Sequence, residues 1–287
     1  MGHDEGAGLK NISDTAFLVA TYRAMESEKP DALFRDPYAK LLVGDQGPAI
    51  INSLKSGKKS SWFLVARTCI LDDWIQNLIR TEGIDTVLNL AAGLDTRAYR
   101  LELPKTLRWF DVDLPEISEY KKTKLQGVTP QCHYENISLD LTRQAERSAL
   151  FSRVARDSRK TLILSEGFLM YLTPTQVKEL ALELAQYSPF RFWLAELIGP
   201  FQLKLIQWKW GKAFKAANAE MTFAPANGPD FFIPYGWNSQ GFRSSFDEAL
   251  KIHRAPPGAA LLKAFFRALP FDAGTRVNRA GITLLTR

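Results

Sequence analysis

The spacing of apolar residues predicts alternating strands and helices through the middle of the chain. Short apolar runs over residues 86–90, 107–112, 131–138, 161–164 and 191–198 are typical of buried strands. Apolar residues recur at helical spacing over 62–80 and again over 174–187, where Thr173 supplies a cap and Pro174 suits the first turn. Because strands alternate with helices, we expect an α/β fold with an open, doubly wound, mostly parallel sheet, to which residues 282–285 return.

Two segments depart from this alternation. The first, residues 1–82, is mainly helical and is expected to form an N-terminal cap or lid. The second, residues 200–237, is rich in aromatic residues interrupted by prolines and glycines, among them Trp208, Trp210, Phe214, Phe223, Phe231, Phe232, Tyr235 and Trp237. It is interpreted either as the wall of a substrate pocket or as a cap on the sheet. We therefore predict one domain over 1–287, with a core at 83–199 and the C-terminal part of the sheet at 238–287.

Composition is that of an ordinary globular protein, with 46% hydrophobic and 24% charged residues. No apolar run approaches the roughly 18 to 20 residues of a membrane-spanning helix, and the polar start lacks a signal-peptide core. We therefore expect a cytoplasmic protein with no membrane partner. The 37 basic and 31 acidic residues give a net charge of +6, which is a weak basis for binding nucleic acid. Cys69 and Cys132 lack metal or redox spacing, so we expect reduced thiols and no metal.

Candidate ligand-binding residues follow three of the predicted strands. In an open α/β sheet, ligands bind beyond the carboxyl ends of the strands. The first strand ends at Ala91 and Gly93, small residues that let a ligand approach the backbone. The second ends at Asp113, 20 residues beyond Gly93, which is typical of a carboxylate that binds a ribose. The fourth ends at Glu166.

The residues after Gly93 argue against a dinucleotide cofactor. A dinucleotide fingerprint needs further glycines, whereas residues 94–97 are Leu, Asp, Thr and Arg. The carboxylate of Asp95 would also lie where a pyrophosphate is expected. A nucleoside cofactor without phosphates, such as S-adenosylmethionine, tolerates an acidic neighbourhood.

Arg67 is a further candidate because it lies on the apolar stripe of the helix over 62–80. A buried guanidinium needs an anionic partner or a route to solvent. The sequence leaves two interpretations open: an ion pair with an Asp or Glu, or a clamp on a ligand carboxylate.

Three motifs carry a resemblance to a known family: residues 93–97 (GLDTR), 110–115 (FDVDLP) and 165–174 (SEGFLMYLTP). With the N-terminal patterns at 15–24 and 36–39, they resemble the leucine carboxyl methyltransferase family, a branch of the class I S-adenosylmethionine-dependent methyltransferases. The family includes polyketide O-methyltransferases of the tetracenomycin type. The resemblance covers roughly residues 13–200, with a weaker trace near Trp237, and implies a Rossmann-like sheet of seven strands.

The resemblance also implies roles for individual residues. Ala91 and Gly93 would lie beside the cofactor, Asp113 with Leu114 at the ribose, and Asp140 with Leu141 at the adenine. Arg67 would bind the cofactor carboxylate, and Glu166 would lie near its methionine moiety. A basic residue on the first helix would assist, and Arg23 is its best match.

The function implied is an O-methyltransferase that methylates a carboxylate or hydroxyl of a small molecule, of a polyketide or other natural-product type. Alternatives are methylation of a protein C-terminal carboxylate, a non-catalytic S-adenosylmethionine-binding protein, and a nucleic-acid methyltransferase. A carboxylate acceptor is already ionised at neutral pH and needs no general base. A phenol needs help, for which His133 and His253 are candidates, and Tyr171 is a candidate to face the acceptor. The sequence sets neither the acceptor nor the oligomeric state.

Overall fold

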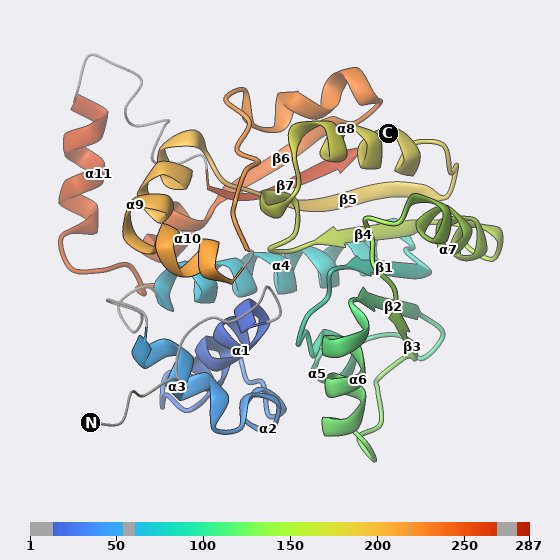
Figure 1. The fold of residues 1–287 in the computed structure, drawn as a ribbon, viewed down its shortest axis with the longest axis horizontal. Helices are drawn as coiled ribbons and strands as arrows, with labels where there is room; N and C mark the ends of the chain where they lie inside the picture. The colour runs from blue at the N-terminus through green and yellow to red at the C-terminus, as the bar shows by residue number, and fades with distance from the viewer. Residues whose placement is uncertain (1–13, 54–60, 218, 269–279) are drawn as a thin grey trace.

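The computed structural model describes residues 14–53, 61–217, 219–268 and 280–287. Within them, seven strands form one sheet in the order β3-β2-β1-β4-β5-β7-β6 (Figure 1). All neighbouring strands pair in parallel except at β7, which runs antiparallel to β5 and β6. The expected doubly wound, mostly parallel sheet is therefore confirmed. The strands are β1 Thr86–Leu90, β2 Arg108–Asp113, β3 His133–Ser138, β4 Thr161–Ser165, β5 Phe190–Leu197, β6 Asn238–Ser244 and β7 Gly281–Thr286.

The order of the strands creates a switch point between β1 and β4. The chain runs outward from β1 through β2 to β3 and then crosses back to place β4 on the other side of β1. Connections at such a point leave in opposite directions, which opens a crevice at the carboxyl ends of the strands.

Helices cover both faces of the sheet. Val87 and Leu162 point into a core shared with α4 and α6, whereas Leu88 and Ile163 point into a core shared with α7 and α8. This alternation is the side-chain period of a strand with both faces buried. The helices are α1 Asp14–Ser27, α2 Ala39–Val43, α3 Gln46–Ser53, α4 Ser61–Glu82, α5 Arg97–Arg100, α6 Pro115–Lys124, α7 Gln144–Arg156, α8 Pro174–Leu184, α9 Pro200–Ala216, α10 Ser245–Lys251 and α11 Ala259–Ala268, with short 3₁₀ helices η2 Leu169–Tyr171 and η3 Gly228–Tyr235.

The N-terminal capping box of α8 matches the sequence prediction. The Thr173 hydroxyl accepts a hydrogen bond from the Gln176 amide at 3.3 Å, and the Gln176 side chain accepts one from the Thr173 amide at 2.8 Å. These contacts satisfy amide groups that the first turn of a helix leaves unpaired. The helix therefore begins at the proline that the sequence indicated.

The edge strand β6 was not predicted as a strand. Its sequence is polar and largely exposed, and the pairing with β7 shifts register between Ser239 and Gly241. An edge strand with one exposed face carries no apolar run, so the pattern that revealed the central strands is absent there.

The N-terminal helices serve two structural purposes. α1 lies at the carboxyl-terminal edge of the sheet and packs against α2 and α3 (Figure 1). Ile75 and Leu78 of α4 belong to the core on one face of the sheet. Residues 1–13 and 54–60 of the expected cap lie outside the described residues. Within the described ranges, no helix is long and apolar enough to span a bilayer.

The aromatic segment 200–237 divides into two parts that lie in different places. Phe223, Phe232 and Trp237 pack with Trp193 into the core beneath α8, and the Trp237 indole donates to the Ala181 carbonyl at 3.0 Å. α9, by contrast, lines a cavity beyond the carboxyl ends of the strands. The second part thus covers the sheet, and the role of α9 as the wall of a substrate pocket stays a prediction.

Candidate functional site

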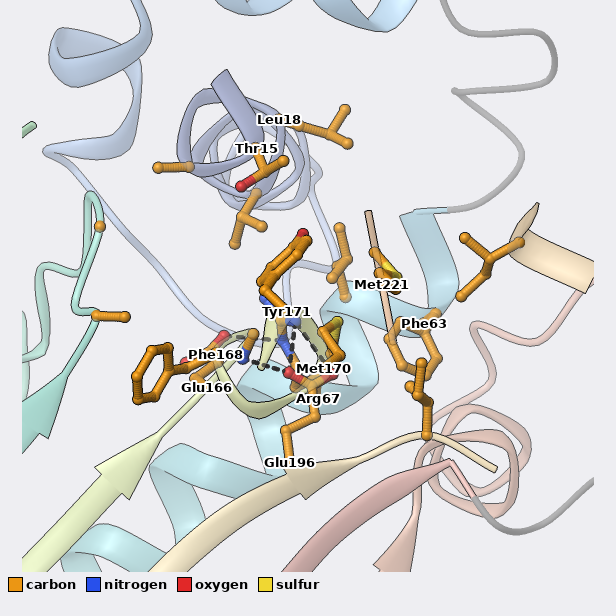
Figure 2. A pocket seen from close by; sticks show the side chains of 18 of the residues that line it. Thr15, Leu18, Phe63, Arg67, Glu166, Phe168, Met170, Tyr171, Glu196 and Met221 are labelled. Carbon is orange, nitrogen blue, oxygen red and sulfur yellow. Dashed lines mark hydrogen bonds and ion pairs between the residues drawn. The ribbon is translucent and has the colours of Figure 1, made fainter. Parts of the chain in front are cut away.

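A cavity of about 820 Å³ lies beyond the carboxyl ends of β1, β2, β4 and β5, and α1, α4 and α9 close its other sides. Its volume falls within the roughly 300–1,000 Å³ of small-molecule sites. The end nearest the strands is lined by polar and charged side chains. The other end is apolar, and its walls include Leu18, Phe63, Met170, Ile206, Trp210 and Met221 (Figure 2).

The cavity contains every residue that the sequence assigned to the cofactor site. The lining includes all nine of these positions and the acceptor-site candidate: Arg23, Arg67, Ala91, Gly93, Asp113, Leu114, Asp140, Leu141, Glu166 and Tyr171. Their roles toward a ligand stay predictions.

Asp113 is held at the end of β2 by two backbone amides. Its carboxylate accepts hydrogen bonds from Gly93 N at 2.5 Å and Leu114 N at 2.7 Å. Burial raises the pKa of Asp113 to about 6, and the two amides partly offset this effect. Each carboxylate oxygen can accept a further hydrogen bond, as a ribose diol requires.

The turn beside Asp113 brings bare backbone to the cavity wall. Ala91 and Gly93 adopt φ values of 54° and 53°, in the left-handed region. A Cβ atom on Gly93 would lie 3.1 Å from Cβ of Ala16 on α1, so glycine permits both this conformation and the close approach of that helix.

Arg67 lies between two glutamates (Figure 2). Its Nε is 2.8 Å from Oε1 of Glu166, and its Nη1 is 2.8 Å from Oε2 of Glu196. Burial raises the pKa of Glu196 above its usual range despite Arg67, whereas the charges of Arg97 and Arg67 outweigh burial and lower the pKa of Glu166. Arg67 thus has the anionic partners that one interpretation required, and it also lies on the cavity wall as the other required.

Arg97 gives Asp95 a charge partner. Its Nη1 lies 2.8 Å from Asp95 Oδ2 and 2.6 Å from Glu166 Oε2, while its Nε lies 2.6 Å from Asp72 Oδ1. The negative charge of Asp95 is therefore compensated, and repulsion of a pyrophosphate is a weaker argument than the sequence suggested. The absence of further glycines after Gly93 still argues against a dinucleotide.

Arg23 forms hydrogen bonds to other parts of the protein. It donates to Asp36 Oδ2 at 2.8 Å and to the Leu94 carbonyl at 2.5 Å, and Asp36 also accepts from the Thr96 hydroxyl at 2.7 Å. These contacts join α1 to the loop that follows β1, although Arg23 also lines the cavity.

These contacts belong to one continuous ion-pair network of four arginines and five carboxylates. Each member lies within 4 Å of an oppositely charged neighbour. The members are Arg23, Arg67, Arg97, Arg100, Asp36, Asp72, Asp95, Glu166 and Glu196. The network thus contains one more carboxylate than guanidinium group.

The three candidates for proton transfer lie in different parts of the structure. Tyr171 lines the cavity, but burial raises its pKa to about 12 despite a hydrogen bond with Thr15, so the phenol is neutral at pH 7. His133 begins β3 at the opposite end of the sheet, and His253 follows α10; neither lines the cavity. Both histidine hypotheses are therefore disfavoured by position.

Both cysteines are free thiols. Burial raises the pKa values of Cys69 and Cys132 to about 12 and about 11. Among the described residues, no cluster of His, Cys, Asp and Glu could hold a metal ion.

Two charged residues of the cavity lining, Glu196 and Lys209, were missed by sequence reasoning. Glu196 lies near the end of β5 within an otherwise apolar run, and this lone carboxylate in a buried strand was a detectable signal. Lys209 of α9 also lines the cavity, but one lysine among the four of that helix carries no signal in the sequence.

Known proteins resemble this chain in sequence and in fold. A sequence model described as leucine carboxyl methyltransferase matches residues 16–185, more than half of the chain. A putative S-adenosyl-L-methionine-dependent methyltransferase of Saccharopolyspora erythraea is 34% identical over 174 residues. The match covers 58% of this chain and 60% of that curated relative, less than two thirds of its length.

Two solved structures share the fold. A DUF574 family protein from Streptomyces avermitilis gives a TM-score of 0.58 at 14% identity and covers 94% of this chain and 96% of its own. A putative methyltransferase from Thermobifida fusca gives a TM-score of 0.57 at 14% identity, covering 97% and 94% respectively.

Proposed function

Because the chain belongs to the leucine carboxyl methyltransferase family of S-adenosylmethionine-dependent methyltransferases, we propose that it transfers a methyl group to an oxygen atom of a small molecule. The observation that carries this proposal is the division of one cavity into a charged end, at the switch point of the sheet, and an apolar end. A cofactor and an acceptor can thus meet within one enclosed space.

The charged end fits S-adenosylmethionine in four respects. Asp113 retains acceptor capacity for a ribose, and the backbone at Ala91 and Gly93 permits close approach. Arg67 lines this end of the cavity, and we propose that it binds the cofactor carboxylate. The surplus carboxylate of the ion-pair network complements a cofactor that carries a sulfonium charge. When bound, the cofactor would supply an electrophilic methyl group.

The side chains that line the cavity favour an acceptor that is already an anion. No histidine or cysteine is among the described lining residues, and Tyr171 keeps its proton at pH 7 because burial raises its pKa to about 12. A carboxylate needs no deprotonation at pH 7, so positioning and exclusion of water suffice. Lys209 supplies a cation on the same wall as the apolar residues. We therefore favour a carboxylate acceptor on an apolar small molecule over a phenol.

The test is methyl transfer from labelled S-adenosylmethionine to a panel of apolar carboxylic acids and phenols. We expect alkali-labile label, the signature of a methyl ester. Stable label on a phenol would move the acceptor to a hydroxyl. Cofactor binding without transfer to any acceptor would favour a non-catalytic binding protein.

A conservative substitution of Asp113 tests the cofactor site. Asp113→Asn keeps the size of the side chain, and we expect it to weaken binding of S-adenosylmethionine at least about tenfold, because it loses a charge-assisted hydrogen bond. Calorimetry that gives the wild-type affinity for this variant would contradict the site. Arg67→Ala is a poorer probe because it also leaves Glu196 buried and unpaired.

A further inference from the structure

Exposed apolar side chains concentrate on α9 and α11. Eleven large hydrophobic residues are exposed in the described part of the chain, and six of them lie on these two helices. Trp208 is 80% exposed and Leu261 is 78% exposed. The two helices lie next to each other on one side of the molecule, away from α7 and β3 (Figure 1). We call this surface, made by Phe201, Leu205, Trp208, Leu261, Leu262 and Phe265, the α9–α11 face.

The apolar residues of each helix share one side of it. At ~100° per residue, Phe201, Leu205 and Trp208 fall within a stripe about 60° wide, and Lys212 and Lys215 continue it toward the end of α9. On α11, Leu261 and Phe265 are one turn apart. A helix that turns apolar and basic side chains outward is typical of a membrane interface.

The charge of this surface has one sign. α9 contains four lysines and no acidic residue, and all four lysines are exposed. None of them forms an ion pair with a carboxylate that the structure describes, and Lys209 lies over the ring of Trp210 with its Nζ 5.7 Å from the ring centroid. α11 also contains no acidic residue, and its Lys263 pairs with Asp247 of α10. Unpaired ammonium groups beside an exposed tryptophan match the headgroup region of an anionic bilayer.

The mouth of the cavity opens on this face. Phe201, Leu205 and Leu262 are at least 42% exposed and also line the cavity. The apolar end of the cavity is therefore continuous with the exposed apolar surface. An apolar molecule dissolved in a lipid layer would enter the cavity from this side without crossing a polar surface.

We propose that the α9–α11 face binds the surface of an anionic phospholipid bilayer. Such peripheral binding needs no spanning helix, so it is compatible with the sequence features that led us to expect no membrane partner. A second copy of this chain fits less well. A symmetric contact would bring the four lysines of α9 against the same four lysines of the other copy.

The test is co-sedimentation of the full chain with vesicles of phosphatidylcholine, with and without phosphatidylglycerol. We expect binding that requires the anionic lipid and weakens with added salt. Lys212→Glu/Lys215→Glu and Trp208→Ser/Leu261→Ser should each reduce binding about tenfold or more. The matched controls are Lys178→Glu and Leu182→Ser, exposed residues on α8 that should leave binding unchanged.

Three outcomes would overturn the proposal. These are no binding to anionic vesicles, equal losses in the α8 controls, or a concentration-dependent dimer that Trp208→Ser/Leu261→Ser dissociates. None of the four substituted α9 and α11 residues lines the cavity, so calorimetry should give each variant the wild-type affinity for S-adenosylmethionine. If the α9–α11 face does not bind bilayers, the proposed methyltransferase activity is unaffected. If the methyltransferase activity is absent, the proposal of bilayer binding is likewise unaffected.

Discussion

The Nη1 atom of Arg67 lies 2.8 Å from Oε2 of Glu196, although 129 residues separate the two in the chain. Arg67 is on α4 and Glu196 is near the end of β5, and both are buried. The same Glu196 oxygen accepts from the Gly167 amide at 2.6 Å. One carboxylate thus ties α4 to the turn after β4, at the wall of the cavity.

Arg67→Leu should lower the free energy of unfolding by about 3–5 kcal/mol, because it leaves the Glu196 carboxylate buried without a cation. Adding Glu196→Leu should recover part of this loss, since the buried carboxylate is then removed together with its cation. Urea unfolding at pH 7 measures both variants. Additive losses would show that the pair is not coupled. The exposed pair Arg153–Glu135 serves as the control, and its removal should have a much smaller effect.

Affinity for S-adenosylmethionine should depend on pH through Asp113. A ribose donates hydrogen bonds to the ionised carboxylate, and the pKa of Asp113 is about 6, so affinity should fall about tenfold between pH 7 and pH 5. Asp113→Asn should remove this slope in calorimetric titrations. A wild-type affinity that is flat from pH 5 to pH 7 would contradict the assignment.

The same carboxyl should affect stability with the opposite sign. Its pKa in the folded protein lies above the ordinary value of 3.8, so the folded state holds the proton more tightly than the unfolded state. The stability it contributes is present below pH 4 and is lost as the pH rises toward 6.

Gly93→Ala should cost more stability than Gly83→Ala. Both glycines adopt positive φ, 53° and 66°, which costs an alanine about 1–2 kcal/mol. A Cβ at Gly83 meets no described atom within 4 Å, whereas a Cβ at Gly93 meets Ala16 at 3.1 Å. Thermal unfolding compares the two variants, and hydrogen exchange of α1 should rise only in Gly93→Ala. Equal losses and an unchanged α1 would show that this helix adapts freely.

Lys209→Gln should raise KM several-fold for carboxylic acid acceptors and leave KM for neutral phenols unchanged. The reason is that Lys209 supplies the cation on the apolar wall of the cavity. Lys212→Gln, one turn along α9 and outside the lining, is the matched control. An equal effect on both acceptor classes would point to a general change in α9.

Much of this fold and site follows from local sequence. The strands of the central sheet can be predicted because burial on both faces requires continuous apolar runs. Thr173 and Pro174 mark the start of α8 through chemistry within one helical turn. Asp113 and Gly93 meet because the ends of adjacent parallel strands meet at one edge of the sheet, so a spacing in the chain becomes a hydrogen bond.

The tertiary structure decided what local patterns cannot encode. The sequence left Arg67 between an ion pair and a ligand clamp, and only the fold brought Glu166 and Glu196 to it. The sequence likewise could not divide the aromatic segment, because both halves are aromatic and only packing separates Trp237 in the core from Trp208 in solvent. Periodicity reports which side of an element is buried, whereas the partner on the other side of the contact comes from a distant part of the chain.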